Sequence, residues 1–249
     1  MSIRTEKVQI PVAGAEAPMP AYLAVPEGKG PFPAVIVIEE IFGINAHIRD
    51  VTERIAREGY LAIAPDVHHR VAAGVELAYD QAGMQQGMSY IPKLSGDGFR
   101  ADMDATIALL RARADVKGDG FGVVGFCIGG HLAYLAAATI PDVKATASFY
   151  GGGVATFSPG DKTPTVNKSA GIKGRILCFF GGKDPMIPQA HVDAVRAALE
   201  AGHVRHEIVV YPEASHAFFC DVPARGSFHA APAADAWSRV KSLFSEELR

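Results

Sequence analysis

Short apolar runs alternate along the chain with segments in which apolar residues recur at helical spacing. The continuous run AVIVIEE (34–40) is typical of a strand buried on both faces of a sheet. Similar runs predict seven strands in all, at residues 21–25, 34–40, 61–65, 120–126, 145–150, 175–181 and 206–211. Helical spacing and end signals predict helices at residues 47–58 (with Asn45 as its cap and Gly59 at its end), 99–113, 129–139, 189–201 and 233–248.

The alternation of strands and helices predicts the fold class. Strands joined by helices form a mostly parallel sheet with helices on both faces, so we expect an α/β fold with about seven to eight strands. Residues 151–173 are rich in Gly, Pro, Ser and Thr, as a linker would be. The strand–helix rhythm resumes after them, however, which indicates a long surface loop. A single domain over residues 1–249 follows.

Composition narrows the classes of function. The 249 residues carry 24 basic and 27 acidic side chains, mixed along the chain, and this argues against nucleic acid as a partner. No run approaches the roughly 20 apolar residues of a membrane span, and MSIRTEKVQIPV lacks the features of a signal peptide. The three widely spaced cysteines predict neither disulfides nor a zinc site. We therefore expect a cytoplasmic protein, a monomer or a homodimer, with no metal and no cofactor.

One cysteine stands in a position typical of a nucleophile. In GFCIGG (125–130), Cys127 lies between Gly125 and Gly129, directly after a predicted strand and before a predicted helix. G-x-C-x-G at such a junction is the pattern of a nucleophile elbow, whose tight turn leaves no room for Cβ atoms two residues away. The helix N-terminus favours a thiolate, and the N–H of Ile128 is placed to donate to an oxyanion. The alternative is a buried cysteine in an ordinary glycine-rich turn.

Two partners follow in the order that a catalytic triad needs. Asp184 follows the strand at 175–181, and His216 follows the strand at 206–211. Sites in open α/β sheets form at these carboxyl ends of the strands. Alone, Asp184 would fit a turn or a helix cap before Pro185, and His216 is one of nine histidines. Together the three predict attack by Cys127, proton transfer by His216 and orientation of the imidazole by Asp184.

Five stretches, taken in order, resemble the dienelactone hydrolases (carboxymethylenebutenolidases) of the α/β-hydrolase superfamily. They are EEIFGIN (39–45), GYLAIAPD (59–66), GFCIGG (125–130), GGKDPMIP (181–188) and YPEASHAFF (211–219). The resemblance implies an α/β-hydrolase fold, hydrolysis of a lactone or ester, and the same triad. It also implies that the carboxylate of Glu40 interacts with the resting thiol until substrate displaces it, and that the N–H of Ile41 is the second oxyanion donor. From the residues alone, Glu40 is either a paired buried acid or a solvent-facing one at a strand end, as Glu39 would be.

The chain departs from the family pattern where a substrate carboxylate would be bound. The resemblance implies an arginine four residues after the catalytic histidine, but Cys220 stands there, and a thiol cannot hold a carboxylate with two hydrogen bonds. Arg225 in the same loop and Arg70 in the segment after 61–65 are the candidate replacements. Phe42, Tyr150 and Phe218, together with Phe219, are candidates for lining an apolar acyl site, with ordinary core packing as the alternative for each. His68 and His69 form an adjacent pair that we interpret as loop residues near the site, not metal ligands.

Three functions remain open at this point. The first is a hydrolase of a small-molecule carboxylic ester or lactone that works through a thioester acyl-enzyme. The second uses the same triad on thioesters, organophosphates or other activated esters, as the missing arginine would permit. The third is a small-molecule-binding protein that has the fold without turnover, although such a protein has no need of an aligned acid and base.

Overall fold

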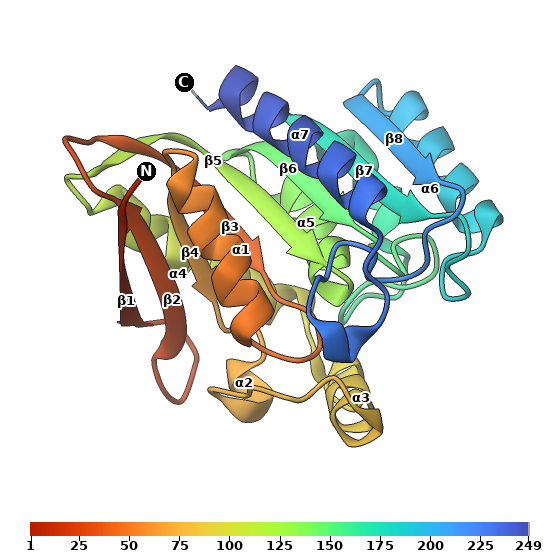
Figure 1. Cartoon of the computed structure of the whole chain (residues 1–249), viewed down its shortest axis with the longest axis horizontal. Helices are drawn as coiled ribbons and strands as arrows, with labels where there is room; N and C mark the ends of the chain where they lie inside the picture. The colour runs from red at the N-terminus through yellow and green to blue at the C-terminus, as the bar shows by residue number, and fades with distance from the viewer. Residues whose placement is uncertain (249) are drawn as a thin grey trace.

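The centre of the molecule is one eight-stranded, mostly parallel sheet (Figure 1). The computed structural model describes residues 1–248. Its strands lie in the order β1-β2-β4-β3-β5-β6-β7-β8. β1 pairs with β2 and β2 with β4 in the antiparallel sense, and every pairing from β4 to β8 is parallel. This confirms the α/β class and the strand number that the sequence predicts.

The elements follow one another as strand, then helix, over most of the chain. The strands are β1 (Ile3–Ile10), β2 (Met19–Pro26), β3 (Phe32–Ile38), β4 (Leu61–Pro65), β5 (Val116–Phe126), β6 (Val143–Phe149), β7 (Arg175–Gly181) and β8 (Arg205–Tyr211). The α-helices are α1 (Ala46–Arg57), α2 (His69–Ala72), α3 (Gln81–Met88), α4 (Gly96–Arg111), α5 (Ile128–Thr139), α6 (Gln189–Ala201) and α7 (Ala230–Glu247). Three short 3₁₀ helices complete the set: η1 (Ile91–Lys93), η2 (Thr165–Gly171) and η3 (Pro223–Arg225).

Helices cover both faces of the sheet, as expected. Figure 1 shows α1 and α7 lying across the face nearer the viewer. α5 packs on β5 and β6, and both α5 and α6 contact η2, so these two helices cover the other face together with α4. Because the strands from β3 to β7 are enclosed on both sides, their residues are almost all buried, which explains their continuous apolar sequences.

The sequence pattern misses the first strand. β1 is an edge strand, and only Ile10 of its eight residues is buried. An edge strand of this kind leaves little hydrophobic alternation to detect. The polar segment after β4 also contains α2 and α3, which the pattern does not separate. Asn45 caps α1 as predicted, since its side chain accepts a hydrogen bond from the N–H of Ile48 at 3.2 Å.

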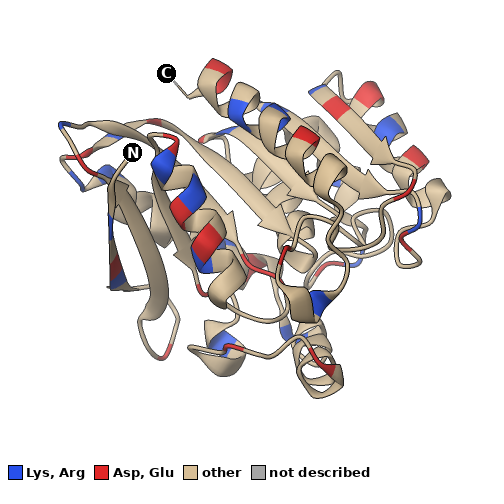
Figure 2. Ribbon diagram, viewed as in Figure 1, with Lys and Arg blue, Asp and Glu red and all other residues tan. Residues whose placement is uncertain are grey.

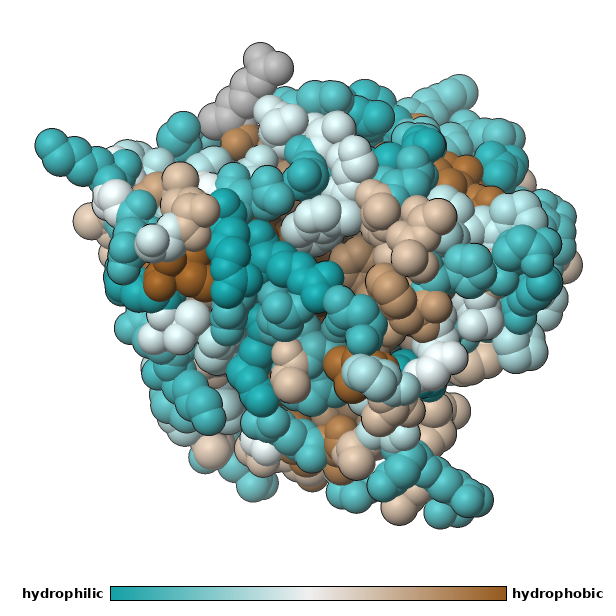
Figure 3. All heavy atoms as spheres, viewed as in Figure 1, coloured by the Kyte–Doolittle hydropathy of each residue, from teal (hydrophilic) through white to brown (hydrophobic). Residues whose placement is uncertain are grey.

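Figure 2 shows acidic and basic residues interleaved along α1 and α7. The side of the molecule seen in Figure 3 is mostly polar, with hydrophobic residues in separate patches. Among residues 1–248, no helix combines the length and the apolar character that crossing a membrane requires.

Candidate active site

Cys127 lies at the junction of β5 and α5 in a strained backbone conformation. Its φ is 57° and its ψ is −120°, which are values that a residue with a Cβ rarely adopts. Its N–H donates to the carbonyl of Phe149 at 3.1 Å, and its carbonyl accepts from the N–H of Gly130 at 2.9 Å. These bonds hold the turn in place, and the side chain is 9% exposed. Such strain is typical of a functional turn held by its surroundings.

The flanking glycines are required by close backbone contacts. A Cβ on Gly125 would lie 1.9 Å from the carbonyl oxygen of Gly129, and a Cβ on Gly129 would lie 2.4 Å from those of Ile38 and Glu39. Neither contact leaves room for a side chain. The second contact also brings the N-terminus of α5 against the end of β3, since β3 and β5 are parallel neighbours.

Asp184 and His216 form a buried pair beyond the ends of β7 and β8. Nδ1 of His216 and Oδ2 of Asp184 are 2.7 Å apart. Oδ1 of Asp184 accepts the N–H of Met186 at 2.8 Å, so both carboxylate oxygens are used. Asp184 therefore fixes the ring with a proton on Nδ1 and directs Nε2 away from itself. Nε2 is buried and has no hydrogen-bond partner among the described residues.

The electrostatic surroundings favour a charged imidazole. Burial lowers the pKa of His216, but the negative charge of a Cys127 thiolate and the hydrogen bond to Asp184 outweigh that effect. They raise the pKa of His216 to about 10. The structure thus brings Cys127, His216 and Asp184 to one edge of the sheet, and the hydrogen bond between His216 and Asp184 joins two of the three.

The two expected oxyanion donors lie at neighbouring strand ends. Ile41 follows β3, and Ile128 is the first residue of α5. Within residues 1–248, neither of their N–H groups donates to another backbone or side-chain group. Their side chains pack together with Phe42 in a small cluster apart from the main core, and further apolar residues cover it: Leu77, Tyr79, Met84, Ile91, Leu94 and Phe157. The cluster therefore places apolar side chains at the end of β3 and at the start of α5, next to Cys127 in the chain.

Glu40 is a buried acid, as the first of the two sequence interpretations has it. Its side chain is fully buried, and Oε2 accepts a hydrogen bond from the hydroxyl of Tyr79 at 3.1 Å. Oε1 has no partner among the described residues. Sequence reasoning missed Tyr79, which lies just before α3 in a segment without strand or motif signals. Its place beside Glu40 depends on how residues 77–94 fold over the site.

Glu39 corrects the sequence interpretation, because it does not face solvent. Its side chain is fully buried, and neither carboxylate oxygen has a hydrogen-bond partner within residues 1–248. Burial, and after it the negative charge of Asp66, raise the pKa of Glu39 well above its usual value of 4.5. Asp66 is itself fixed by the N–H groups of His68 and Gly74, at 3.1 and 2.6 Å. A proton on Glu39 relieves the repulsion between the two acids.

We expect Glu39→Gln to stabilise the protein at neutral and alkaline pH. An acid whose pKa is raised in the folded state supports folding fully below 4.5, and this support is lost as the pH rises through the folded pKa. Glutamine has no proton to lose. Thermal unfolding at pH 5 and pH 8 should show a higher Tm for the variant at pH 8, by roughly 2–4 °C for each kcal/mol gained, and a smaller difference at pH 5. Glu16→Gln, at an exposed position, is the control; parallel Tm–pH curves for parent and Glu39→Gln would contradict the prediction.

The two candidate arginines lie in different places. Arg70 is bound by Asp102 at 2.8 Å, and its other contact is the carbonyl of Gly14 in the β1–β2 turn. Arg225, at the end of η3, lies over the rings of Phe42 and Tyr79, with its Cζ 5.5 and 5.7 Å from their centroids. The structure therefore brings Arg225 to the apolar cluster and not Arg70.

The other candidate residues from the sequence also lie in different surroundings. Tyr150 is fully buried at the end of β6, with its ring centroid 5.1 Å from that of His216. Phe218 lies in the main core against Phe149, Tyr150 and Tyr211, so the packing alternative describes it. His68 is buried with Nε2 3.2 Å from the carbonyl oxygen of Glu40, and His69 contacts Asp102.

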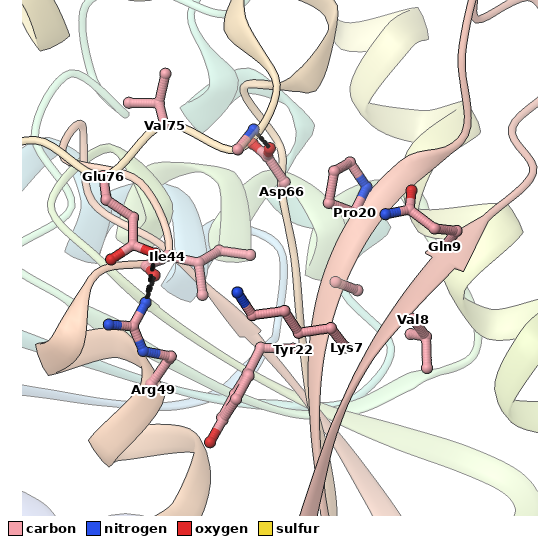
Figure 4. A pocket seen from close by; sticks show the side chains of 12 residues that line it. Lys7, Val8, Gln9, Pro20, Tyr22, Ile44, Arg49, Asp66, Val75 and Glu76 are labelled. Carbon is pink, nitrogen blue, oxygen red and sulfur yellow. Dashed lines mark hydrogen bonds and ion pairs between the residues drawn. The ribbon is translucent and has the colours of Figure 1, made fainter.

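A separate pocket of about 120 Å³ lies beside β1 and β2 (Figure 4). Its lining comprises Lys7, Val8, Gln9, Pro20, Ala21, Tyr22, Ile44, Arg49, Asp66, Gly74, Val75 and Glu76. Arg49 and Glu76 pair with each other at 2.8 Å, and Asp66 holds the N–H of Gly74. None of Cys127, Asp184 and His216 lines this pocket. Within residues 1–248, no cluster of three or more His, Cys, Asp or Glu residues is arranged to hold a metal ion.

Comparison with known proteins points to one family. A family model described as the dienelactone hydrolase family matches residues 19–248. A Synechocystis sp. protein named "Putative carboxymethylenebutenolidase" is 44% identical over 249 residues, which are 100% of this chain and 99% of that protein. The crystal structure of a "Putative Dienelactone Hydrolase" from Klebsiella pneumoniae is 37% identical, with a TM-score of 0.87, and the match covers 99% of this chain and 100% of that one. The dienelactone hydrolase-like promiscuous phosphotriesterase P91, from metagenomic libraries, is 25% identical, with a TM-score of 0.81 over the whole of both chains.

Proposed function

This chain belongs to the dienelactone hydrolase family, and we propose that it hydrolyses carboxylic esters or lactones through Cys127, His216 and Asp184. One observation carries the proposal. At the edge of the sheet where a strained turn presents Cys127, Asp184 holds the imidazole of His216 through a 2.7 Å contact and leaves its buried Nε2 without a partner among the described residues. An imidazole oriented in this way can take the proton of a thiol and later give it to the leaving group.

The reaction follows in two halves. The sulfur of Cys127 attacks the carbonyl carbon, and the N–H groups of Ile128 and Ile41 bind the oxygen as it becomes negative. The carbon–oxygen bond to the leaving group breaks, and His216 protonates that oxygen, which leaves a thioester on Cys127. His216 then takes a proton from water, the resulting hydroxide attacks the thioester, and the acid product leaves as the thiol is restored. The family resemblance implies that Glu40 interacts with the resting thiol and gives way to substrate; its Oε1, which has no partner among the described residues, is the atom free to do so.

Arg225 is the group that would select substrates by charge. No ion pair within residues 1–248 involves its guanidinium, and its Nε is buried without a partner. It lies beside the cluster of Ile41, Phe42 and Ile128, from the same loop as Cys220. A carboxylate on the substrate would supply the missing partner. We therefore propose lactones or esters that carry a carboxylate near the reacting carbonyl as the preferred substrates.

Hydrolysis of paired substrates tests the function and this preference together. We expect parent protein to hydrolyse both a carboxylate-bearing enol lactone and p-nitrophenyl acetate. Arg225→Gln should lower kcat/KM for the lactone by roughly 10–100-fold, the worth of a lost charge-assisted hydrogen bond, and by less than about threefold for the neutral ester. Arg70→Gln removes a charge while keeping a donor for Asp102, so it should leave the preference unchanged. No turnover of either substrate by the parent contradicts the function, and equal losses on both substrates contradict the role of Arg225.

A second activity has specific support. P91, which resembles this chain over its whole length, is called a promiscuous phosphotriesterase, and Cys220 leaves the implied arginine position neutral here. A thiolate can attack phosphorus with the same partners. Assaying a neutral phosphotriester beside the enol lactone and p-nitrophenyl acetate decides between lactone hydrolysis and phosphotriester hydrolysis. Faster turnover of the phosphotriester than of the anionic lactone favours phosphotriester hydrolysis.

A further inference from the structure

Tyr150 occupies a strained position between the nucleophile and its acid–base partners. It directly follows β6, which lies between β5, the strand before Cys127, and β7, the strand before Asp184. Its φ is 38°, an outlier for a bulky aromatic residue, and its N–H donates to the carbonyl of Phe179 at 2.7 Å. Backbone strain held in this way fixes the direction of the side chain.

The hydroxyl of Tyr150 is a buried donor without an acceptor. Its side chain is fully buried, and the hydroxyl oxygen has no hydrogen-bond partner among the described residues. Burial and the charges of Glu40, Cys220 and Cys127 raise the pKa of Tyr150 well above its usual value of 10, so the phenol keeps its proton. An unpartnered buried hydroxyl is costly and calls for an explanation.

The hydroxyl bonds to none of the acceptors around it, including Oε1 of Glu40, which is itself without a partner among the described residues. Both oxygens of Asp184 are taken by His216 and Met186, and Oε2 of Glu40 is taken by Tyr79. Substrate brings new acceptors. Of the two expected oxyanion donors, Ile41 follows β3 and Ile128 follows Cys127 after β5, whereas Tyr150 follows β6 and His216 follows β8. The ring centroids of Tyr150 and His216 are 5.1 Å apart, so the two side chains are neighbours on that side.

We propose that Tyr150 is a further catalytic residue, whose hydroxyl donates a hydrogen bond to the leaving-group oxygen as the tetrahedral intermediate collapses. This rests on the proposed function. The carbon–oxygen bond breaks, negative charge grows on the oxygen, His216 transfers its proton to that oxygen, and Tyr150 keeps its own proton while stabilising the charge. The contribution matters most when the leaving alcohol is a poor one, because more charge must then be neutralised.

Tyr150→Phe tests the role, measured on acetate esters with leaving groups from p-nitrophenol to simple alkyl alcohols. We expect kcat/KM to fall by roughly 10–100-fold for alkyl esters and by less than about threefold for p-nitrophenyl acetate, so that dependence on the leaving group becomes steeper. The Tm should equal or exceed that of the parent, because an unpartnered hydroxyl is removed. The matched control is Tyr134→Phe, since the hydroxyl of Tyr134 is buried against Ser169 at 2.5 Å.

Failure of the role of Tyr150 can be told apart from failure of the proposed hydrolase function. A uniform loss across the ester series, or no loss, with a folded variant overturns the role of Tyr150 while parent turnover leaves the triad standing. A parent that hydrolyses none of the esters fails the proposed function itself. A steeper slope in Tyr134→Phe as well would show an effect of losing any buried hydroxyl and would equally overturn the assignment.

Discussion

Replacing Cys127 with alanine is expected to abolish ester and lactone hydrolysis, with kcat falling by roughly 10⁴-fold or more. The loss should be this large because, in the proposed mechanism, His216 and Asp184 act only through the nucleophile. The binding groups and the N–H groups of Ile128 and Ile41 would remain, so any residual rate comes from them. The backbone at position 127 accepts alanine no worse than cysteine, and the variant should therefore fold. Initial rates on p-nitrophenyl acetate and an enol lactone, with Tm as the check of folding, give the answer.

Chemical modification locates the same thiol independently. Iodoacetamide should inactivate the parent through one modification, mapped by mass spectrometry to the peptide that contains Cys127, and substrate should protect it. Cys178 is the matched control: it is fully buried in β7, and burial raises its pKa to about 12, so it is unreactive. Cys178→Ala should keep its turnover. Equal turnover by Cys127→Ala and parent, or inactivation by alkylation of Cys178 or Cys220 alone, would contradict the assignment.

The strands of the sheet could be predicted from the sequence wherever they are buried, because a buried strand has a continuous apolar sequence. β4, β7 and α6 lie at the predicted residues because their apolar runs end at glycine or proline. β1 could not be found, since an edge strand with one buried residue has almost no pattern. The grouping of Cys127, Asp184 and His216 could also be predicted. The carboxyl ends of parallel strands lie at one edge of the sheet, so residues that directly follow those strands lie near one another.

The rest of the site depends on contacts that no linear pattern records. Glu39 and Glu40 are adjacent and identical in type, yet one faces Asp66 and the other meets Tyr79. Tyr79 enters the site because residues 77–94 fold over Ile41 and Phe42. Arg225 reaches the same cluster from η3, five residues beyond the position at which the family resemblance implies a cation. Each of these depends on side-chain packing between segments far apart in the chain.

Asp184→Asn is the second change with a large expected effect on activity, because both carboxylate oxygens of Asp184 accept hydrogen bonds. An amide offers one acceptor and one donor. If its oxygen keeps the N–H of Met186, its NH₂ faces Nδ1 of His216 and forces the proton onto Nε2, so that the ring cannot accept a proton from the thiol. If its oxygen faces His216 instead, the NH₂ meets the N–H of Met186. In either orientation the asparagine loses one of the two hydrogen bonds that Asp184 accepts, and it does so in a side chain that is fully buried.

We therefore expect kcat to fall by roughly 10³–10⁴-fold while the fold is retained. The variant should also lower the pKa of His216 from about 10, since the hydrogen bond to Asp184 is one of the causes that raise it. Titration of His216 by NMR would show its imidazolium losing the proton at lower pH than in the parent. The control is Asp193→Asn, which alters an exposed acid paired only with Gln189 on the surface of α6. Activity within threefold of the parent, or an unchanged His216 titration, would mean that Asp184 caps its turn through Met186 and plays no part in orienting the base.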